Sequence, residues 1–360
     1  MKKMTKFILG FLLLAVAVCT YAGADTLTAC GVPQFIVDAL SMGSSGMSAA
    51  TILPFGETQT GIVIAYKNKK LIADQVMPIK MLDSNKLNFK YFERTKGDAF
   101  TVEDTKVGRT SEPNVINLGG TEKTDFCVAR GLEDIIPVED IRQLDNKERF
   151  TNTHFENLIG KVLLGREKAV AAMVQDVNNY GTGLSHTYGE SEGMGATGFD
   201  IVKVIFEYLD KPLARPNILG MGATAYHALR TDPKVLSAVY PNNQGNGVAT
   251  KEQLCALFEV DQILVGEARV NTTKNAKNPV LERCWGNHIW GHYQEDLTTL
   301  TEGIAWGITA QSGERYSSIV FDEKRGLEGS EILKAGMYQK EVVVGKDAGF
   351  LLKNVVKTTT

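Results

Sequence analysis

One block near the middle of the chain constrains the fold more than any other stretch. Asn217 to Leu219 has the composition of a short buried strand, and Gly220-Met221-Gly222 is predicted to be a tight turn. Ala223 to Arg230 has helical spacing, and an Asp-Pro pair begins a second predicted helix over Asp232 to Val239. A strand that leads directly into helices predicts a layer in which both are mixed.

The alternation of strands and helices continues on both sides of this block. Apolar residues at helical spacing predict helices over Phe199 to Leu209 and Lys251 to Phe258, and Gln262 to Gly266 is predicted to be a strand. Near the C-terminus, Glu341 to Val344 and Phe350 to Val356 have strand composition. Together these segments predict a mixed α/β (α+β) fold.

The longest predicted helix runs from Thr153 to about Asn178. Thr153 and Glu156 have the T-x-x-E spacing of a capping box, which predicts that the helix begins there. At 1.5 Å per residue such a helix would span roughly 36 Å. Its apolar residues fall on one face, at Phe155, Ile159, Val162, Leu163, Val170, Met173, Val174 and Val177.

A long polar connection separates two predicted strands. Leu87 to Phe92 has strand composition with Phe89 and Tyr91 on one face, and Phe126 to Ala129 is its expected partner strand. Glu93 to Glu122, between them, is polar, mixed in charge and rich in turn residues. So long a connection is unusual inside a compact domain unless it has a function, such as lying on a neighbouring subunit.

The composition excludes some classes of protein. The formal net charge is −3, whereas a free-standing nucleic-acid binder would be basic. The five cysteines are dispersed with no C-x-x-C pair, which argues against a disulfide framework. They are Cys19, Cys30, Cys127, Cys255 and Cys284.

The N-terminus has the layout of a secretory signal peptide. Three lysines precede an apolar run from Phe7 to Cys19, and Ala22-Gly23-Ala24 offers a cleavage site. A cleaved export signal over residues 1–24 is the favoured interpretation. The alternatives are that the segment is retained as an apolar arm or that translation starts further downstream. Ser41 to Ala50, rich in glycine and serine, is interpreted as an extended arm or a disordered linker.

Two patterns could carry chemistry. Gly220-x-Gly222-x-x-Ala225 has the spacing of a dinucleotide-binding turn, but the region about 20 residues on, Pro241 to Gln244, has no acidic residue. A glycine-assisted tight turn is therefore the preferred interpretation.

The second pattern is Cys284-x3-His288-x3-His292, which could supply three zinc ligands. Its tryptophans and glycines indicate a strand or turn rather than a helix, and a packed aromatic strand is expected. The acidic pairs Glu133/Asp134 and Glu139/Asp140 are expected in a solvated turn or in ion pairs between subunits. Cys127 and Cys255 have no local signature of a catalytic thiol.

An ordered series of segments carries a resemblance to a known family. The segments are Ile62–Ile79, Leu87–Arg109, Thr124–Arg142, Phe155–Val174, Arg215–Tyr240, Ala249–Thr272 and Cys284–Tyr293. Over about residues 60 to 300 the series resembles the major capsid proteins of tailed bacteriophages, whose fold is shared with encapsulins.

The resemblance implies a division of the chain. It predicts an N-terminal arm, an extended two-stranded loop, a peripheral domain that holds a spine helix, and an axial domain. The expected ranges are 1–24 for the signal-like apolar segment, 25–77 for the arm and the strand that follows it, 78–128 for the loop, 129–195 for the peripheral domain, 196–325 for the axial domain and 326–360 for the return to the peripheral domain.

The resemblance also implies a function. The chain would self-assemble in the host cytoplasm into the icosahedral head of a virion, as pentamers and hexamers that enclose double-stranded DNA without sequence-specific binding. Scaffold, portal and decoration proteins are expected partners, and a membrane contact could come only from residues 1–24. No enzyme activity, catalytic residue, cofactor or metal is expected.

Contacts with neighbours are expected from the loop, at Phe89, Tyr91, Arg94, Lys96 and Arg109. Two alternatives stay open. One is an encapsulin-like compartment shell, and the other is an exported envelope protein if residues 1–24 are a cleaved signal.

Overall fold

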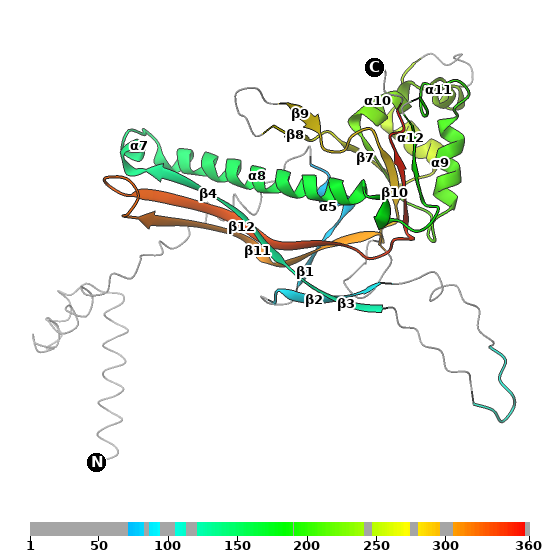
Figure 1. Ribbon diagram of the computed structural model, residues 1–360, viewed down its shortest axis with the longest axis horizontal. Helices are drawn as coiled ribbons and strands as arrows, with labels where there is room; N and C mark the ends of the chain where they lie inside the picture. The colour runs from blue at the N-terminus through cyan, green and yellow to red at the C-terminus, as the bar shows by residue number, and fades with distance from the viewer. Residues whose placement is uncertain are drawn as a thin grey trace, which may run out of the picture. The chain divides into compact units, whose positions relative to one another are not determined.

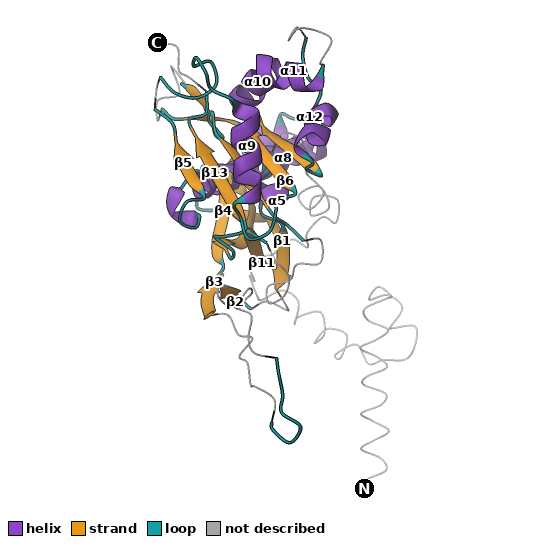
Figure 2. Ribbon diagram, turned by 90° about the vertical axis from the view of Figure 1, so that its right-hand side faces the viewer, coloured by secondary structure: helices purple, strands orange, loops and turns teal. Residues whose placement is uncertain are grey.

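A long α-helix lies along a sheet of long strands, and together they form one elongated part of the molecule, which we call the long layer (Figure 1). The second part, which we call the compact lobe, has a five-stranded sheet with the helices α9 to α12 around it (Figure 2). Both parts belong to a unit that runs from Pro54 to Thr360.

The computed structural model describes residues 71–82, 86–93, 105–112, 121–189, 191–240, 247–273, 280–295 and 305–356. The predictions for residues 1–70, including the signal-like segment and the arm, therefore lie outside the described residues. Within the described ranges, no helix is both long and apolar enough to cross a bilayer.

The long layer is a four-stranded sheet covered on one face by helix α8. The strand order is β1-β11-β12-β4, in which the long β11 and β12 form an antiparallel hairpin and β1 pairs with β11 in parallel. Apolar residues of α8, among them Phe155 and Ile159, pack against Leu333 and Ala335 of β12. The elements are β1 (Ile79–Leu82), β4 (Val128–Pro137), α8 (Lys147–Val174), β11 (Gly307–Asp322) and β12 (Ser330–Val343).

The predicted start of the long helix is wrong. The helix begins at Lys147, where the Asn146 side chain caps it by accepting a hydrogen bond from the Arg149 backbone N–H (3.0 Å). Thr153 lies inside the helix, and its hydroxyl donates to the Arg149 carbonyl (2.9 Å). The helix ends at Val174, before a short 3-10 turn over Val177–Asn179, so its 28 residues span about 42 Å.

Most of the predicted alternation of strands and helices is confirmed in the compact lobe. Its strand order is β5-β13-β10-β6-β7, and its core includes the chain's three tryptophans. The elements are β5 (Ser185–Thr187), α9 (Ile201–Asp210), β6 (Ile218–Gly222), α10 (Ala223–Thr231), α11 (Pro233–Val239), α12 (Lys251–Phe258), β7 (Gln262–Gly266), β10 (Ile289–His292) and β13 (Gly349–Lys353). Helix α12 and strand β7 have the predicted bounds.

The predicted turn at Gly220-Met221-Gly222 is wrong, because all three residues belong to strand β6. A Cβ atom on Gly220 would lie 2.2 Å from the Trp290 ring, and one on Gly222 would lie 1.9 Å from the Gly286 carbonyl oxygen. The glycines are therefore required by the close approach of neighbouring groups rather than by a turn.

Two small antiparallel ribbons complete the described chain. One pairs β2 (Asn88–Glu93) with β3 (Thr121–Phe126), and the other pairs β8 (Arg269–Asn271) with β9 (Leu281–Arg283). The expected partner strand over Phe126 to Ala129 is wrong, because the ladder uses Thr121 to Phe126 and β4 starts at Val128. Two short helices, α5 (Ala73–Val76) and α7 (Val138–Arg142), flank the long layer.

The two C-terminal strands go to different sheets. The predicted strand at Glu341 to Val344 is the end of the longer β12 in the long layer, whereas β13 pairs with β10 and β5 in the compact lobe. The expectation that both return to the sheet of the long helix is therefore wrong for β13. Strand β11, placed by the sequence in the other domain, lies in the long layer.

Candidate functional site

The glycine pattern does not form a cofactor-binding turn. Gly220 and Gly222 are buried in β6, and Ala225 is buried in α10. The Trp290 ring and the Gly286 carbonyl occupy the space beside the two glycines. A pyrophosphate group needs free backbone N–H groups at a helix N-terminus, and these contacts leave no room for it.

The two histidines of the Cys-His-His pattern are core residues of the compact lobe. His288 and His292 are buried, and desolvation lowers the pKa of each to about 4. The Nδ1 atom of His288 accepts a hydrogen bond from the Asn354 backbone N–H (3.0 Å). Burial also raises the pKa of the Cys284 thiol to about 11, which disfavours the thiolate that zinc requires. Among the described residues, no group of three or more potential ligands gathers at one point.

The other candidate groups have structural surroundings as well. Burial raises the pKa of the thiols of Cys127 and Cys255, which makes both poor nucleophiles. Glu133 and Asp134 lie in strand β4 rather than in the expected turn. Asp134 pairs with His154 (2.5 Å), and Glu133 pairs with Lys334 and Arg325, all within the chain. Glu139 and Asp140 lie in the first turn of α7.

The predicted contact residues of the loop have different positions. Phe89 is 5 % exposed and packs with Ile308 and Val342 of the long layer, so it anchors the β2–β3 ribbon to its own chain. Little of the Phe89 side chain is therefore left exposed for a contact with a neighbour. Tyr91 is partly buried beside it, and Arg109 is exposed in the turn at the tip of the connection. Arg94 and Lys96 lie outside the described residues.

The ladder of the β2–β3 ribbon is held by ion pairs across its strands. Lys90 pairs with Glu122, and Lys123 pairs with Glu93. Near the base, Asp125 pairs with Lys340 of β12 (3.5 Å). An isolated two-stranded ribbon is at best marginally stable in water. Its stability within one chain therefore depends on these ion pairs and on the packing of Phe89 at its base.

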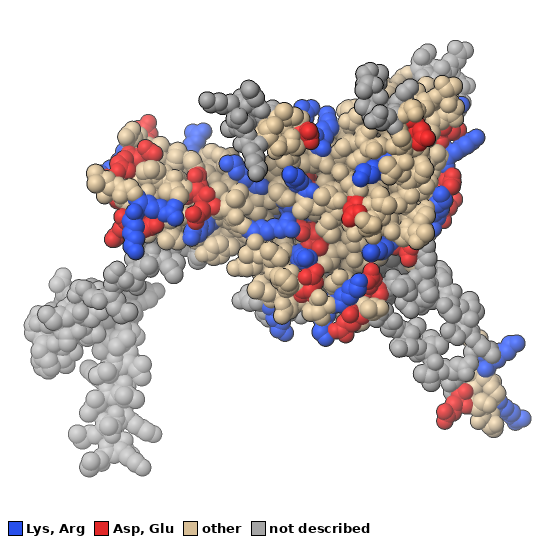
Figure 3. Space-filling view, viewed as in Figure 1, with Lys and Arg blue, Asp and Glu red and all other residues tan. Residues whose placement is uncertain are grey.

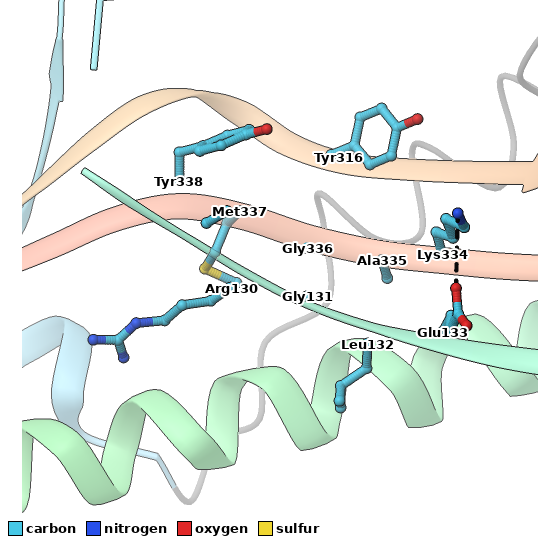
Figure 4. Close-up of a pocket in the computed structure, with 11 residues that line it drawn as sticks. Arg130, Gly131, Leu132, Glu133, Tyr316, Lys334, Ala335, Gly336, Met337 and Tyr338 are labelled. Carbon is cyan, nitrogen blue, oxygen red and sulfur yellow. Dashed lines mark ion pairs between the residues drawn. The ribbon is translucent and has the colours of Figure 1, made fainter. Parts of the chain in front are cut away.

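A groove lies on the face of the long layer that points away from α8. Gly131 of β4 and Gly336 of β12 are register partners and form its floor. Tyr316 and Tyr338 stand beside this floor and point away from the helix, whereas Leu132 points toward it (Figure 4). The hollow has a volume of about 400 Å³.

The groove has an apolar, exposed lining with a charged end. Tyr316 is 50 % exposed and Tyr338 is 42 % exposed, although both are large aromatic residues. A Cβ atom on Gly336 would lie 2.6 Å from the Arg130 carbonyl oxygen, so a side chain there would both clash and fill the hollow. The Glu133–Lys334 ion pair (3.7 Å) lies at one end. Aromatic walls over a bare backbone floor suit an extended chain or an inserted side chain.

Sequence reasoning missed this groove for a definite reason. Both tyrosines lie on strands whose alternation is obscured by buried polar residues, such as Thr309 of β11 and Gln339 of β12. The one usable signal was the pair of glycines inside strand-like segments, since such glycines often mark a close approach of another backbone. On the face shown in Figure 3, acidic and basic side chains are interspersed over both parts of the molecule.

Known proteins similar to this chain are found by sequence and by structure. The chain is 32% identical over 303 residues to the major capsid protein of Pseudomonas phage JBD67, covering 84% of this chain and 97% of that protein. It is 23% identical over 308 residues to the major capsid protein of Burkholderia phage BcepMu, covering 82% and 95%. No family model matches the sequence.

One solved structure shows the same fold. A phage-related protein from Bordetella bronchiseptica RB50 superposes with a TM-score of 0.65 at 20% sequence identity. The superposition covers 83% of this chain and 96% of that one, so it includes both the long layer and the compact lobe.

Proposed function

The chain belongs to the phage major capsid proteins, and on this premise we propose that its copies close into an icosahedral head around double-stranded DNA. As a major capsid protein it is a structural subunit of the virion that self-assembles into an oligomeric shell. We further propose that the shell assembles in the host cytoplasm from rings of five and six copies, with scaffold, portal and decoration proteins as partners. In this role the chain catalyses no reaction.

Two surface features support this proposal: a two-stranded ribbon and an exposed aromatic groove. Within the residues that the structure describes, a single subunit leaves both without a binding partner. The β2–β3 ribbon has exposed charged side chains along its ladder, and the face of the long layer opposite α8 has an exposed aromatic groove. A protruding element and a receiving surface at different places on one molecule allow heterologous contacts that close into rings. We propose that the connection between β2 and β3 of one copy lies in the groove of the next.

The described tip of the connection fits such a contact chemically. Residues 105–112 are exposed, with the apolar Val107 (51 % exposed) between Lys106 and Arg109. Tyrosine faces accept both aliphatic groups and guanidinium groups. Arg109 and Tyr91 therefore remain proposed contact residues. Arg94 and Lys96, which follow Tyr91 closely in sequence, are proposed as well.

The division into domains is also a proposal. The long layer corresponds to the expected peripheral domain with its spine helix, and the compact lobe corresponds to the axial domain. The strand pairing favours two changes to the expected ranges of 129–195, 196–325 and 326–360, because β11 lies with the long layer and β13 lies with the compact lobe.

Electron microscopy of the expressed chain tests the proposal directly. We expect closed shells or rings, and a chain that stays monomeric at all concentrations would contradict it. Deleting Glu93 to Glu122 should leave folded subunits, as judged by circular dichroism, that form no shells. Normal shells from this variant would refute the role of the connection.

The groove has its own test. Replacing both Tyr316 and Tyr338 by serine should abolish shells while the subunit stays folded, because the substituted side chains point away from the core. Val248→Ser is the matched control, since Val248 is a similarly exposed apolar residue (45 %) in the compact lobe. Shells of normal size and yield from the tyrosine variant would remove the groove from the proposal.

The alternatives predict other outcomes. The relatives are phage capsid proteins, so an encapsulin-like compartment is the weaker alternative, and shells that package a protein cargo instead of DNA would favour it. An exported envelope protein would lose residues 1–24, and the intact mass of the purified protein measures that loss.

A further inference from the structure

Two adjacent charged residues are buried in the middle of helix α8. Arg166 is 2 % exposed and Glu167 is fully buried. They lie between Leu163, which packs in the core of the long layer, and Val170, which packs in the core of the compact lobe. A buried charge is strongly unfavourable unless its partners are fixed around it. The partners of Arg166 and Glu167 therefore show which parts of the chain are joined at this point of α8.

Glu167 binds two parts of the chain that are distant in sequence. Its Oε1 and Oε2 atoms accept hydrogen bonds from the backbone N–H groups of Ile72 (3.0 Å) and Ala73 (2.8 Å). Its Oε1 also accepts from the indole Nε1–H of Trp285 (2.7 Å). Trp285 is fixed in the compact lobe, because its ring stacks on Trp290 of β10 with 4.7 Å between centroids.

Arg166 holds the other end of the same short segment. It forms an ion pair with Asp74, and its Nη2 donates to the Met77 carbonyl (3.2 Å) and to the Thr309 hydroxyl of β11 (3.0 Å). We call residues Ile72–Met77, which contain α5, the strap. Figure 1 shows α5 beside α8, where the helix meets the compact lobe. The strap begins directly after Leu71, the first described residue of the chain.

We propose that Glu167 couples the seating of the compact lobe on α8 to the docking of the strap. Among the described residues, it is the side chain that hydrogen-bonds both the strap and a tryptophan of the lobe. When Trp285 moves away, the buried carboxylate loses one of three donors. Its remaining bonds to Ile72 and Ala73 then weaken, because a less solvated carboxylate is driven toward its neutral form, which accepts hydrogen bonds poorly.

The consequence is that two conformational changes within one subunit are coupled. A shift of the compact lobe against α8 would loosen the strap. A shift of the strap would in turn loosen the lobe, since the coupling is reciprocal. The device acts within one subunit, so it does not depend on the proposed shell.

Hydrogen exchange of the unassembled full-length chain, read by mass spectrometry over residues 71–77, tests the coupling. The key variant is Trp285→Phe, which keeps an aromatic ring at this position but removes the Nε1–H that donates to Glu167. We expect exchange in residues 71–77 to accelerate by about tenfold, which is the usual effect of losing one charge-assisted hydrogen bond. Glu167→Gln should accelerate the same peptide at least as much.

Trp306→Phe is the matched control. Trp306 is equally buried in the same lobe and stacks on Tyr180 (5.4 Å), but it does not contact Glu167. It should leave exchange of residues 71–77 unchanged.

Three results would overturn the proposal. Equal acceleration by the control would show only general destabilisation of the lobe. Acceleration by Glu167→Gln without any from Trp285→Phe would leave Glu167 as a local anchor that is not coupled to the lobe. No acceleration in either variant would mean that the strap is held by other contacts. All three results are independent of whether the variants form shells.

Discussion

Acidification should destabilise the compact lobe before carboxylates titrate extensively. His288 and His292 are buried as neutral imidazoles, with pKa values lowered from 6.5 to about 4 by desolvation and, for His288, by the nearby Lys353. The folded state therefore binds fewer protons than the unfolded state. Stability is complete above pH 6.5 and is lost as the pH falls toward 4. Per histidine, the loss between pH 7.5 and pH 5 is about 2 kcal/mol, and the two together give about 4 kcal/mol.

Tryptophan fluorescence can report the unfolding of the compact lobe. All three tryptophans, Trp285, Trp290 and Trp306, are buried in the core cluster of the compact lobe. Intrinsic fluorescence during urea unfolding of the unassembled chain thus reports on the part that contains both histidines. The free energy of unfolding should be compared at pH 7.5, 6.5, 5.5 and 5.0.

A single substitution separates the histidines from other titrating groups. His292→Leu removes one buried imidazole and should halve the loss, to about 2 kcal/mol between pH 7.5 and pH 5. His227→Gln, at an exposed position of α10, should leave the loss unchanged. The reasoning is wrong if the wild-type stability is flat over this range, or if His292→Leu keeps the full slope.

Four further substitutions test the packing of two glycines and the burial of two ion pairs. Gly220→Ala should lower the free energy of unfolding by about 1–3 kcal/mol, because its Cβ would lie 2.2 Å from a tryptophan ring. Gly165→Ala, at a helical position with nothing within 4 Å of the new Cβ, should raise it by about 1 kcal/mol. Both are measured by urea unfolding. Arg130→Met removes the 2.7 Å partner of the buried Glu341 but leaves it near Arg166 (3.8 Å), and should lower the free energy of unfolding by about 1–3 kcal/mol. Lys90→Met, in an exposed pair, should change stability by less than about 1 kcal/mol, and an equal effect of the two would contradict the assignment of burial.

The compact lobe could be predicted from sequence because its local signals agree with its packing. Helix α12 has a true capping box, in which Thr250 accepts from the Gln253 N–H, and the apolar strand β7 follows it at once. The family resemblance was likewise carried by segments of this kind. The order of strands in the sheets was not accessible, since it depends on partners far apart in the chain.

The long layer was harder to predict because the hydrophobic pattern of its strands is irregular. Strand β11 buries Thr309, Gln311 and Ser317 on its inner positions, so hydrophobic alternation fails there. Gln311 is satisfied by a hydrogen bond from Gln339 of β12 (2.7 Å), a residue that local sequence does not connect with it. The groove and the buried pair on α8 were missed for the same reason. Each is made by residues whose neighbours come from distant parts of the chain.

The charged ladder of the β2–β3 ribbon has a consequence for subunits that have not yet joined a particle. In the described chain these strands pair only with each other, so both outer edges expose backbone groups that could template random aggregation. Alternating lysines and glutamates make such mispairing weak and easily reversed. Such charges disfavour edge-to-edge pairing of strands from different copies. A copy that docks in the wrong place can also leave again, which gives a growing lattice a way to correct errors.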